Sequence, residues 1–215
     1  MRINTKYGLG LAVLVALLTS PASFAVEGSS GDPAKGEANA LICSGCHGQD
    51  GHSTIDPSYA KLAGQNEKYL YNQLSMIRDD ERKIALMTGI LTGKSDQDLR
   101  DLAAYFANLP ADTDRVADLN ETQVLRAEEI YRGGIADRAV AACAACHGPR
   151  GNGNRFAGFP SIAGQSAEYT VNQLTAYREQ QRGSSDGASG MMWGVARGLT
   201  DGDIQILAQY IQGLN

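Results

Sequence analysis

Cys143-Ala144-Ala145-Cys146-His147-Gly148 is the stretch of sequence that decides the fold. Two cysteines stand three positions apart with a histidine directly behind them, and the same arrangement occurs at Cys43-Ser44-Gly45-Cys46-His47-Gly48. The chain of 215 residues contains only 4 cysteines, so the two stretches use all of them. The pattern therefore indicates that the chain contains two sites with the same chemistry.

C-x-x-C-H is the pattern through which haem c attaches, because two thiols add to the haem vinyl groups and the histidine takes an axial position on iron. A redox dithiol would not need the histidine, and a zinc site would have to join sulfurs from two distant parts of the chain. A disulfide within either motif is the third alternative. We expect two covalently attached haem c groups, bound through Cys43, Cys46, Cys143 and Cys146, with His47 and His147 as ligands of iron.

The N-terminus predicts an export signal. Arg2 and Lys6 precede an apolar run at residues 8–18, and Ser23-Phe24-Ala25 is a small-x-small site for signal peptidase. We expect residues 1–25 to be cleaved and the mature protein to be periplasmic; an uncleaved anchor is the alternative. Without Arg2 and Lys6, the 19 basic residues fall to 17 against 24 acidic ones, a net charge of −7 that argues against nucleic acid as a partner.

An internal repeat sets the domain organisation. At an offset of 100 positions, Leu62-Ala63-Gly64-Gln65 matches Ile162-Ala163-Gly164-Gln165. After an insertion of five residues the offset becomes 105, which aligns Met87 with Met192. The expected organisation is a signal peptide at 1–25, a first domain at 26–110, a linker at 111–121 and a second domain at 122–215.

Both domains are predicted to be helical. Ser95 and Thr200 each precede acidic residues and an apolar stripe with i, i+3, i+4, i+7 spacing, which is typical of a capped helix buried on one face. We expect further helices at residues 33–43 and 123–131, and no alternating apolar run is long enough for a strand. The two stripes consist of Leu99, Leu102, Ala103 and Phe106, and of Ile204, Leu207, Ala208 and Ile211.

The remaining axial position of each iron must be open or filled by a second side chain. Apart from the motif histidines the chain has only His52, whose counterpart is Asn152, so the second iron has no further histidine in its own repeat. Met87 and Met192 occupy matching positions, each before a glycine-containing loop. We predict that both are axial ligands. Met191 is the rival at the second site, core packing is the alternative for any methionine, and His52 is expected in a surface loop.

Histidine and methionine together would fill both axial positions and raise the reduction potential. Such an iron exchanges electrons but offers no place for a substrate. We therefore expect an electron carrier and not an enzyme. The runner-up is a dihaem peroxidase-type enzyme, which would need an open iron and distal acid–base residues.

Several motifs together resemble the cytochrome c4 family: two C-x-x-C-H-G motifs, two A-G-Q segments, matched N-Q-L helices and two M-x-G loops before L-A-x-Y helices. The resemblance covers essentially the whole mature chain. It implies an all-α fold of two tandem class I cytochrome c domains that carries single electrons between a respiratory donor and a terminal oxidase. The expected partners also include a membrane quinol-oxidising complex or a dehydrogenase. The alternative function is that of a cytochrome subunit fixed within a dehydrogenase complex. We expect a monomer, and peripheral association with a membrane is left open.

One position departs from the family pattern. Pro160 stands where such domains place a proline whose carbonyl accepts a hydrogen bond from the haem histidine, but the first repeat has Ala60 there. A carbonyl is still available, but the rigid φ of proline is lost, so we expect a looser hold on His47.

Charges near the two motifs differ. Asp50 and Asp56 follow the first motif, whereas Arg138, Arg150 and Arg155 flank the second. Because cations disfavour the ferric state, we predict a higher reduction potential for the C-terminal haem, unless these groups are screened by solvent.

Two further pairs recur at the offset of 100. Arg78 and Arg178 would pair with haem propionates or face solvent, and we favour solvent. Tyr69 and Tyr169 are expected to pack within the fold.

Overall fold

The computed structural model describes residues 30–87, 89–113, 117–182 and 187–215. In these ranges the chain forms helices and, apart from two isolated β-bridges, no β-structure, as the sequence predicts. The expected signal peptide at 1–25 lies outside the described residues. Among the helices that are described, none combines the length and apolar character needed to cross a membrane.

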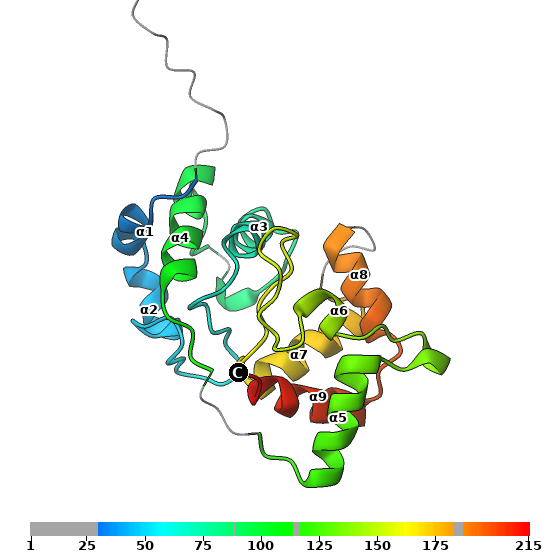
Figure 1. Ribbon diagram of the computed structural model, residues 1–215. Helices are drawn as coiled ribbons and strands as arrows, with labels where there is room; N and C mark the ends of the chain where they lie inside the picture. The colour runs from blue at the N-terminus through cyan, green and yellow to red at the C-terminus, as the bar shows by residue number, and fades with distance from the viewer. Residues whose placement is uncertain (1–29, 88, 114–116, 183–186) are drawn as a thin grey trace, which may run out of the picture.

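The first domain is organised around its C-terminal helix. Helix α4 packs against α1 and α3, and α2 follows α1 directly. Figure 1 shows these four helices together on one side of the molecule. The elements of this domain are α1 (Pro33–Asn39), α2 (Leu41–His47), α3 (Glu67–Arg78), the 3-10 helix η1 (Ala85–Met87) and α4 (Asp96–Asn108).

The second domain repeats this plan. Helix α9 packs against α5 and α7, as α4 packs against α1 and α3, while α8 packs against α7. These helices form the other side of the molecule in Figure 1. The elements are α5 (Glu121–Gly133), the 3-10 helix η2 (Ala136–Arg138), α6 (Ala144–His147), α7 (Ala167–Arg178), α8 (Gly187–Ala196) and α9 (Asp201–Gln212).

The C-terminal helix of each domain is capped and buried as predicted. The side chain of Ser95 accepts a hydrogen bond from the Asp98 amide, the Asp98 side chain accepts one from the Ser95 amide, and Thr200 and Asp203 form the same capping box. No residue of either predicted apolar stripe is more than 4 % exposed. These two helices therefore supply the cores against which the rest of each domain packs.

The single helix expected at residues 33–43 is in fact two helices. The amide of Ala40 donates to the carbonyl of Glu37, and the amide of Cys43 donates to the carbonyl of Ala40. Bonds between residues three apart tighten the turn and interrupt the α-helical ladder. The interruption gives the first cysteine motif its own short helix, α2.

Helix α1 crosses α4 very closely at Gly36. A Cβ atom there would lie 2.0 Å from the carbonyl oxygen of Asp101, so any side chain would push the helices apart.

Candidate haem-binding sites

The two cysteine motifs form short helices of similar geometry. Cys43 and Cys46 lie in α2, while Cys143 directly precedes α6, which contains Cys146. A spacing of three residues places both sulfurs of a motif on one face of a single helical turn. All four thiols are free in the structure, so neither motif is closed by a disulfide.

The two motif histidines are oriented by backbone carbonyl groups. Nδ1 of His47 lies 2.7 Å from the carbonyl oxygen of Ala60, and Nδ1 of His147 lies 2.9 Å from that of Pro160. Burial lowers the pKa of both imidazoles, and the carbonyl partner opposes this shift only partly. A neutral ring that donates from Nδ1 keeps the lone pair of Nε2 for a metal.

The replacement of proline by Ala60 does not remove this hydrogen bond. Its length at His47 is no greater than at His147. The acceptor belongs to the backbone, so alanine supplies it as well as proline does. The looser hold that we expected for His47 is therefore not seen in its hydrogen bond.

Three of the sulfurs that the sequence singled out pack against apolar clusters, whereas Cys46 and Cys146 are exposed. Cys43 and Met87 both pack against the buried cluster of the first domain, together with Leu74. Cys143 packs against the corresponding cluster of the second domain. Burial raises the pKa of the Cys143 thiol to about 11 and shifts that of Cys43 in the same direction. Two thiols, a neutral imidazole and an apolar wall form a donor set that fits covalently attached haem.

The two predicted methionine ligands lie in different local structures. Met87 ends the 3-10 helix η1, before Gly89, which adopts a φ of 86°. Met192 lies inside helix α8, and the following Gly194 is also helical. The expected loop is thus wrong for the second repeat, where an α-helix of 10 residues stands in place of the 3-residue η1. Met192 is partly buried whereas Met191 is 51 % exposed, which favours Met192 over its rival.

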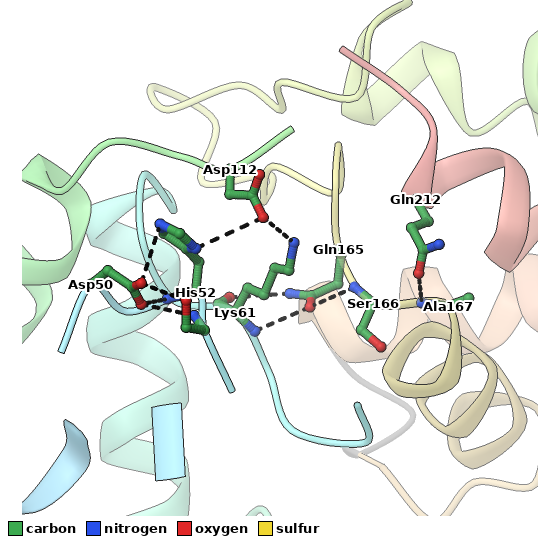
Figure 2. Close-up of polar contacts among 9 residues, drawn as sticks. Asp50, His52, Lys61, Asp112, Gln165, Ser166, Ala167 and Gln212 are labelled. Carbon is green, nitrogen blue, oxygen red and sulfur yellow. Dashed lines mark hydrogen bonds and ion pairs between the residues drawn. The ribbon is translucent and has the colours of Figure 1, made fainter. Parts of the chain in front are cut away.

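His52 lies at the boundary between the domains and is not a freely exposed surface residue. Figure 2 shows its ring between two carboxylates, with Nε2 3.6 Å from Asp50 and Nδ1 3.8 Å from Asp112. The Nζ atom of Lys61, whose side chain is 8 % exposed, lies 3.0 Å from the same Asp112 carboxylate. His52 thus contributes to the junction between the first domain and the following segment.

The two A-G-Q segments hold the domains together. Oε1 of Gln65 accepts a hydrogen bond from the Ser161 amide at 2.8 Å, and its Nε2 donates to the Ser161 carbonyl at 2.7 Å. Gln165 makes the same pair of bonds to the backbone of Lys61, each 3.1 Å long (Figure 2). Their recurrence at one offset was visible in the sequence, but an interfacial role was not.

The recurring arginines Arg78 and Arg178 are tied to protein carboxylates. Nη1 of Arg78 lies 2.7 Å from Asp96, and Nη1 of Arg178 lies 2.7 Å from Asp201. Each arginine therefore joins the end of α3 or α7 to the start of the C-terminal helix of its domain. Both side chains remain partly exposed, at 20–22 %, and their partners Asp96 and Asp201 are exposed, so these are ion pairs at the surface.

Comparisons with known proteins agree with this geometry. Residues 136–215 match the family model described as "Cytochrome c". These residues contain the whole second motif and the helices α6, α7, α8 and α9. The class of protein that the fold and the motifs define is therefore that of the c-type cytochromes.

Similarity over the full length identifies the family within this class. The chain is 43% identical to cytochrome c4 of Pseudomonas aeruginosa over 94% of its own length and 98% of the relative. It superposes on the crystal structure of reduced cytochrome c4 from Pseudomonas stutzeri with a TM-score of 0.79 and 42% identity, covering 86% of this chain and all of that one. The chain belongs to the cytochrome c4 family.

A second group of relatives is more distant. The chain is 32% identical to the thiosulfate dehydrogenase electron acceptor of Stutzerimonas stutzeri over 93% of its length and 92% of the relative. This relative is named as an electron acceptor. The protein is thus a dihaem electron-transfer cytochrome with covalently bound haem c, and it is a carrier and not an enzyme.

Proposed function

We propose that this protein carries single electrons in the periplasm and that both of its irons have one histidine and one methionine ligand. The single observation that carries the proposal is the matched hydrogen bond from Nδ1 of each motif histidine to a backbone carbonyl. It fixes the ring in the tautomer whose Nε2 atom is available to iron. The proposed ligand pairs are His47 with Met87 and His147 with Met192, and the proposed thioethers are at Cys43, Cys46, Cys143 and Cys146.

The two proposed sites lie in separate domains, for which we propose the boundaries 26–110 and 122–215, with a linker at 111–121. The residues at 1–25 would be removed on export, which is the step that leads to the periplasm. Helix α4 ends at Asn108, two residues before the end of the proposed first domain, and α5 begins at Glu121, the last residue of the proposed linker.

Haem c supplies a one-electron couple between ferric and ferrous iron. The role of the chain is to hold that couple at a useful potential and to keep other ligands away. The carbonyls of Ala60 and Pro160 orient the imidazoles, and the apolar walls around Cys43 and Cys143 exclude water. A thioether opposite each imidazole would raise the potential and leave no open position for peroxide.

We infer that the donor is a respiratory complex or dehydrogenase and that the acceptor is a terminal oxidase or a similar protein. A role as the electron acceptor of a dehydrogenase is the second candidate, and the relatives named thiosulfate dehydrogenase electron acceptor favour it. Their identity to this chain is lower than that of the cytochrome c4 relatives. Reduction of the purified protein by thiosulfate dehydrogenase, compared with reduction by a quinol-oxidising complex, would separate the two roles.

One spectrum tests the ligand assignment. The oxidised protein should show the weak near-infrared band of sulfur-to-iron charge transfer with an intensity that corresponds to two haems. Carbon monoxide should not bind to the reduced protein at neutral pH, and peroxide should not be turned over. A band of half the expected intensity would mean that one methionine assignment is wrong.

A further inference from the structure

His52 is the one histidine outside the two motifs, and its ring lies between two carboxylates. Nε2 lies 3.6 Å from Asp50, and Nδ1 lies 3.8 Å from Asp112, which belongs to the segment after the first domain (Figure 2). The side chain is 25% exposed, so solvent reaches it, whereas Nδ1 is buried and has no hydrogen-bond partner within the described ranges. A proton bound at either ring nitrogen would therefore point towards a negative charge.

Two carboxylates and one ammonium group lie around this ring. Hydrogen bonds from the side chain and amide of Ser53, and from the amide of His52, lower the pKa of Asp50 far below its ordinary range, so it stays a carboxylate. Asp112 binds Nζ of Lys61, whose side chain is only 8% exposed, at 3.0 Å. A proton on His52 would bring these four side chains to two positive and two negative charges, and paired charges are those that partial burial tolerates best.

The ring also borders a small cavity between the domains. Its volume is about 20 Å³, which is enough for one water molecule. Lys61 and Asp112 line it together with His52, and the lining residues from the second domain are uncharged: Ser161, Ala163 and Gln165. The partly exposed ring and this polar cavity give a proton a route between solvent and His52.

The second domain has no equivalent of this group. At the offset of 100, the counterparts of Asp50, His52 and Lys61 are Arg150, Asn152 and Ser161. These positions hold neither an acid nor a histidine. The second haem therefore serves as a comparison within the same molecule.

Short backbone links join His52 to the motif histidine of its own domain. The carbonyl of Gly51, the residue before His52, accepts a hydrogen bond from the Leu62 amide at 2.8 Å. Two residues before Leu62, the carbonyl of Ala60 lies 2.7 Å from Nδ1 of His47. His52 also follows His47 by five residues, which limits the distance between their Cα atoms to about 18 Å. A partly buried charge at this range acts on the iron with less screening than an exposed one.

We propose that His52 takes up a proton when the first haem is reduced, so that this domain transfers a proton together with its electron. Ferric iron accepts one electron from the donor protein and His52 accepts one proton from water, and reoxidation releases both. Because a positive charge on His52 disfavours ferric iron, reduction and protonation favour each other. The inference rests on the covalent haem of the proposed function, but it does not depend on which side chain is the sixth ligand.

The potential of the first haem should therefore depend on pH. Histidine is the side chain whose ordinary change of charge falls between about pH 5 and pH 8. At low pH, His52 holds its proton in both redox states and the potential is high. At high pH, it holds none in either state and the potential is low, so reduction takes up a proton only between these limits.

The test compares the full-length holoprotein with His52→Asn, which copies the residue of the second domain. Spectroelectrochemical titrations at several pH values give the potentials, and haem methyl signals in NMR spectra of partly reduced samples assign them to the two haems. We expect the potential of the first haem to fall as the pH rises in the wild type, and most of this fall to be lost in His52→Asn. Haem propionates titrate in both proteins, so the difference between the two isolates His52.

Two further variants sharpen the test. Asp112→Asn removes one of the carboxylates that face the ring, so the fall in potential should move to lower pH because the protonated ring loses an opposite charge. Asp56→Asn is the control, since it removes a carboxylate from the same loop that binds Ser58 instead. Hydrogen bonds from Ser58 lower the pKa of Asp56, so its charge is constant over this pH range and its removal should leave the slope unchanged.

Several outcomes would overturn the proposal. The slope could be the same in His52→Asn as in the wild type, or Asp56→Asn could reduce it as much, or the second haem could show the larger dependence on His52. If His52→Asn fails to fold, a fall that stays at the same pH in Asp112→Asn would contradict the proposal. Loss of the near-infrared band over the same pH range would also contradict it, because exchange of an iron ligand would then explain the fall. The methionine assignment is judged by the intensity of that band and this inference by its constancy with pH, so the two can fail separately.

Discussion

The two domains share one plan and differ in the segment that follows their third main helix. Both orient the motif histidine through a carbonyl, cap the last helix with a capping box and tie that helix to an arginine. They differ where the methionine lies, since η1 carries Met87 and α8 carries Met192. The segments that carry the motif histidines are thus duplicated closely, while the segments that carry the proposed methionine ligands have diverged. Two haems in such surroundings should be chemically unequal.

The largest difference between the two domains should appear when one haem is removed at a time. Replacing Cys43 and Cys46 by alanine, or Cys143 and Cys146, should reduce the haem content from two per chain to one. The domain without haem should lose its cooperative unfolding, because small domains depend on such groups to complete their cores. Pyridine haemochrome assays and thermal circular dichroism would measure both effects. Native-like unfolding of the haem-free domain would contradict this expectation.

Replacing each methionine tests whether η1 and α8, despite their different structures, both supply an axial ligand to iron. Met87→Ala and Met192→Ala should each lower the potential of one haem by on the order of 0.1 V, a fraction of the range that axial ligands span. Carbon monoxide should then bind to that haem in the reduced protein. Met191→Ala is the matched control and should change neither property. A larger effect in Met191→Ala than in Met192→Ala would reverse the assignment at the second site.

The capping boxes of the two domains should differ by a smaller amount in their contribution to the free energy of unfolding. Hydrogen bonds from Arg138 and Thr200 lower the pKa of Asp203 to about 2 although burial opposes the shift. The depressed pKa stabilises the folded state above the unfolded value of roughly 4, and this contribution is lost as the pH falls through about 2.

Asp203→Asn should therefore reduce the free energy of unfolding by about 1–2 kcal/mol at pH 7, and the difference from wild type should shrink below roughly pH 4. Denaturant titrations at several pH values would measure it. Asp98→Asn is the matched change in the first domain and should have a smaller effect, because Asp98 is less buried than Asp203 and has no arginine partner among its described contacts. Equal effects would mean that the Arg138 pair adds nothing.

The smallest expected difference concerns Pro160 and Ala60. Pro160→Ala should lower the free energy of unfolding by about 0.4–1 kcal/mol, because alanine gives the unfolded chain more freedom. The potential of the C-terminal haem should stay the same, since the acceptor for His147 is a backbone atom. A measurable change in that potential would show that the rigidity of proline matters beyond the hydrogen bond.

The higher potential that we predict for the C-terminal haem depends on the arginines near its motif. Arg138 is paired with Asp203 at 2.7 Å, so its charge is largely neutralised. Arg150 and Arg155 are exposed and remain as the groups that would raise the potential. Titration of Met87→Ala and Met192→Ala would assign each potential to its domain and would test this order.

Much of the fold could be predicted because its determinants are local. The cap at Ser95, the cap at Thr200 and the buried stripes behind them depend on neighbouring residues, and all of them are confirmed. The break at Ala40 and the helix around Met192 were missed. Both depend on packing that weak local preferences do not determine.

The residues at the domain boundary were the hardest to interpret. The matched positions of Arg82 and Arg182 were visible in the repeat, but their burial depends on how two domains dock across a separation of 100 positions. Gln65 and Gln165 were recognised only as a family signature, although they bind the opposite domain. The recurrence of a polar residue at the offset of 100 was the signal that could have identified all four.

The reciprocal hydrogen bonds between the two domains resemble those of an isologous dimer, although both halves belong to a single chain. Gln65 contacts the other domain as Gln165 does, and Tyr69 meets Arg182 as Tyr169 meets Arg82. Self-complementary surfaces of this kind close upon themselves, so they leave no matching face for a third copy. The covalent connection makes the pairing independent of protein concentration, and a diffusing carrier can deliver two redox centres as one particle even at high dilution.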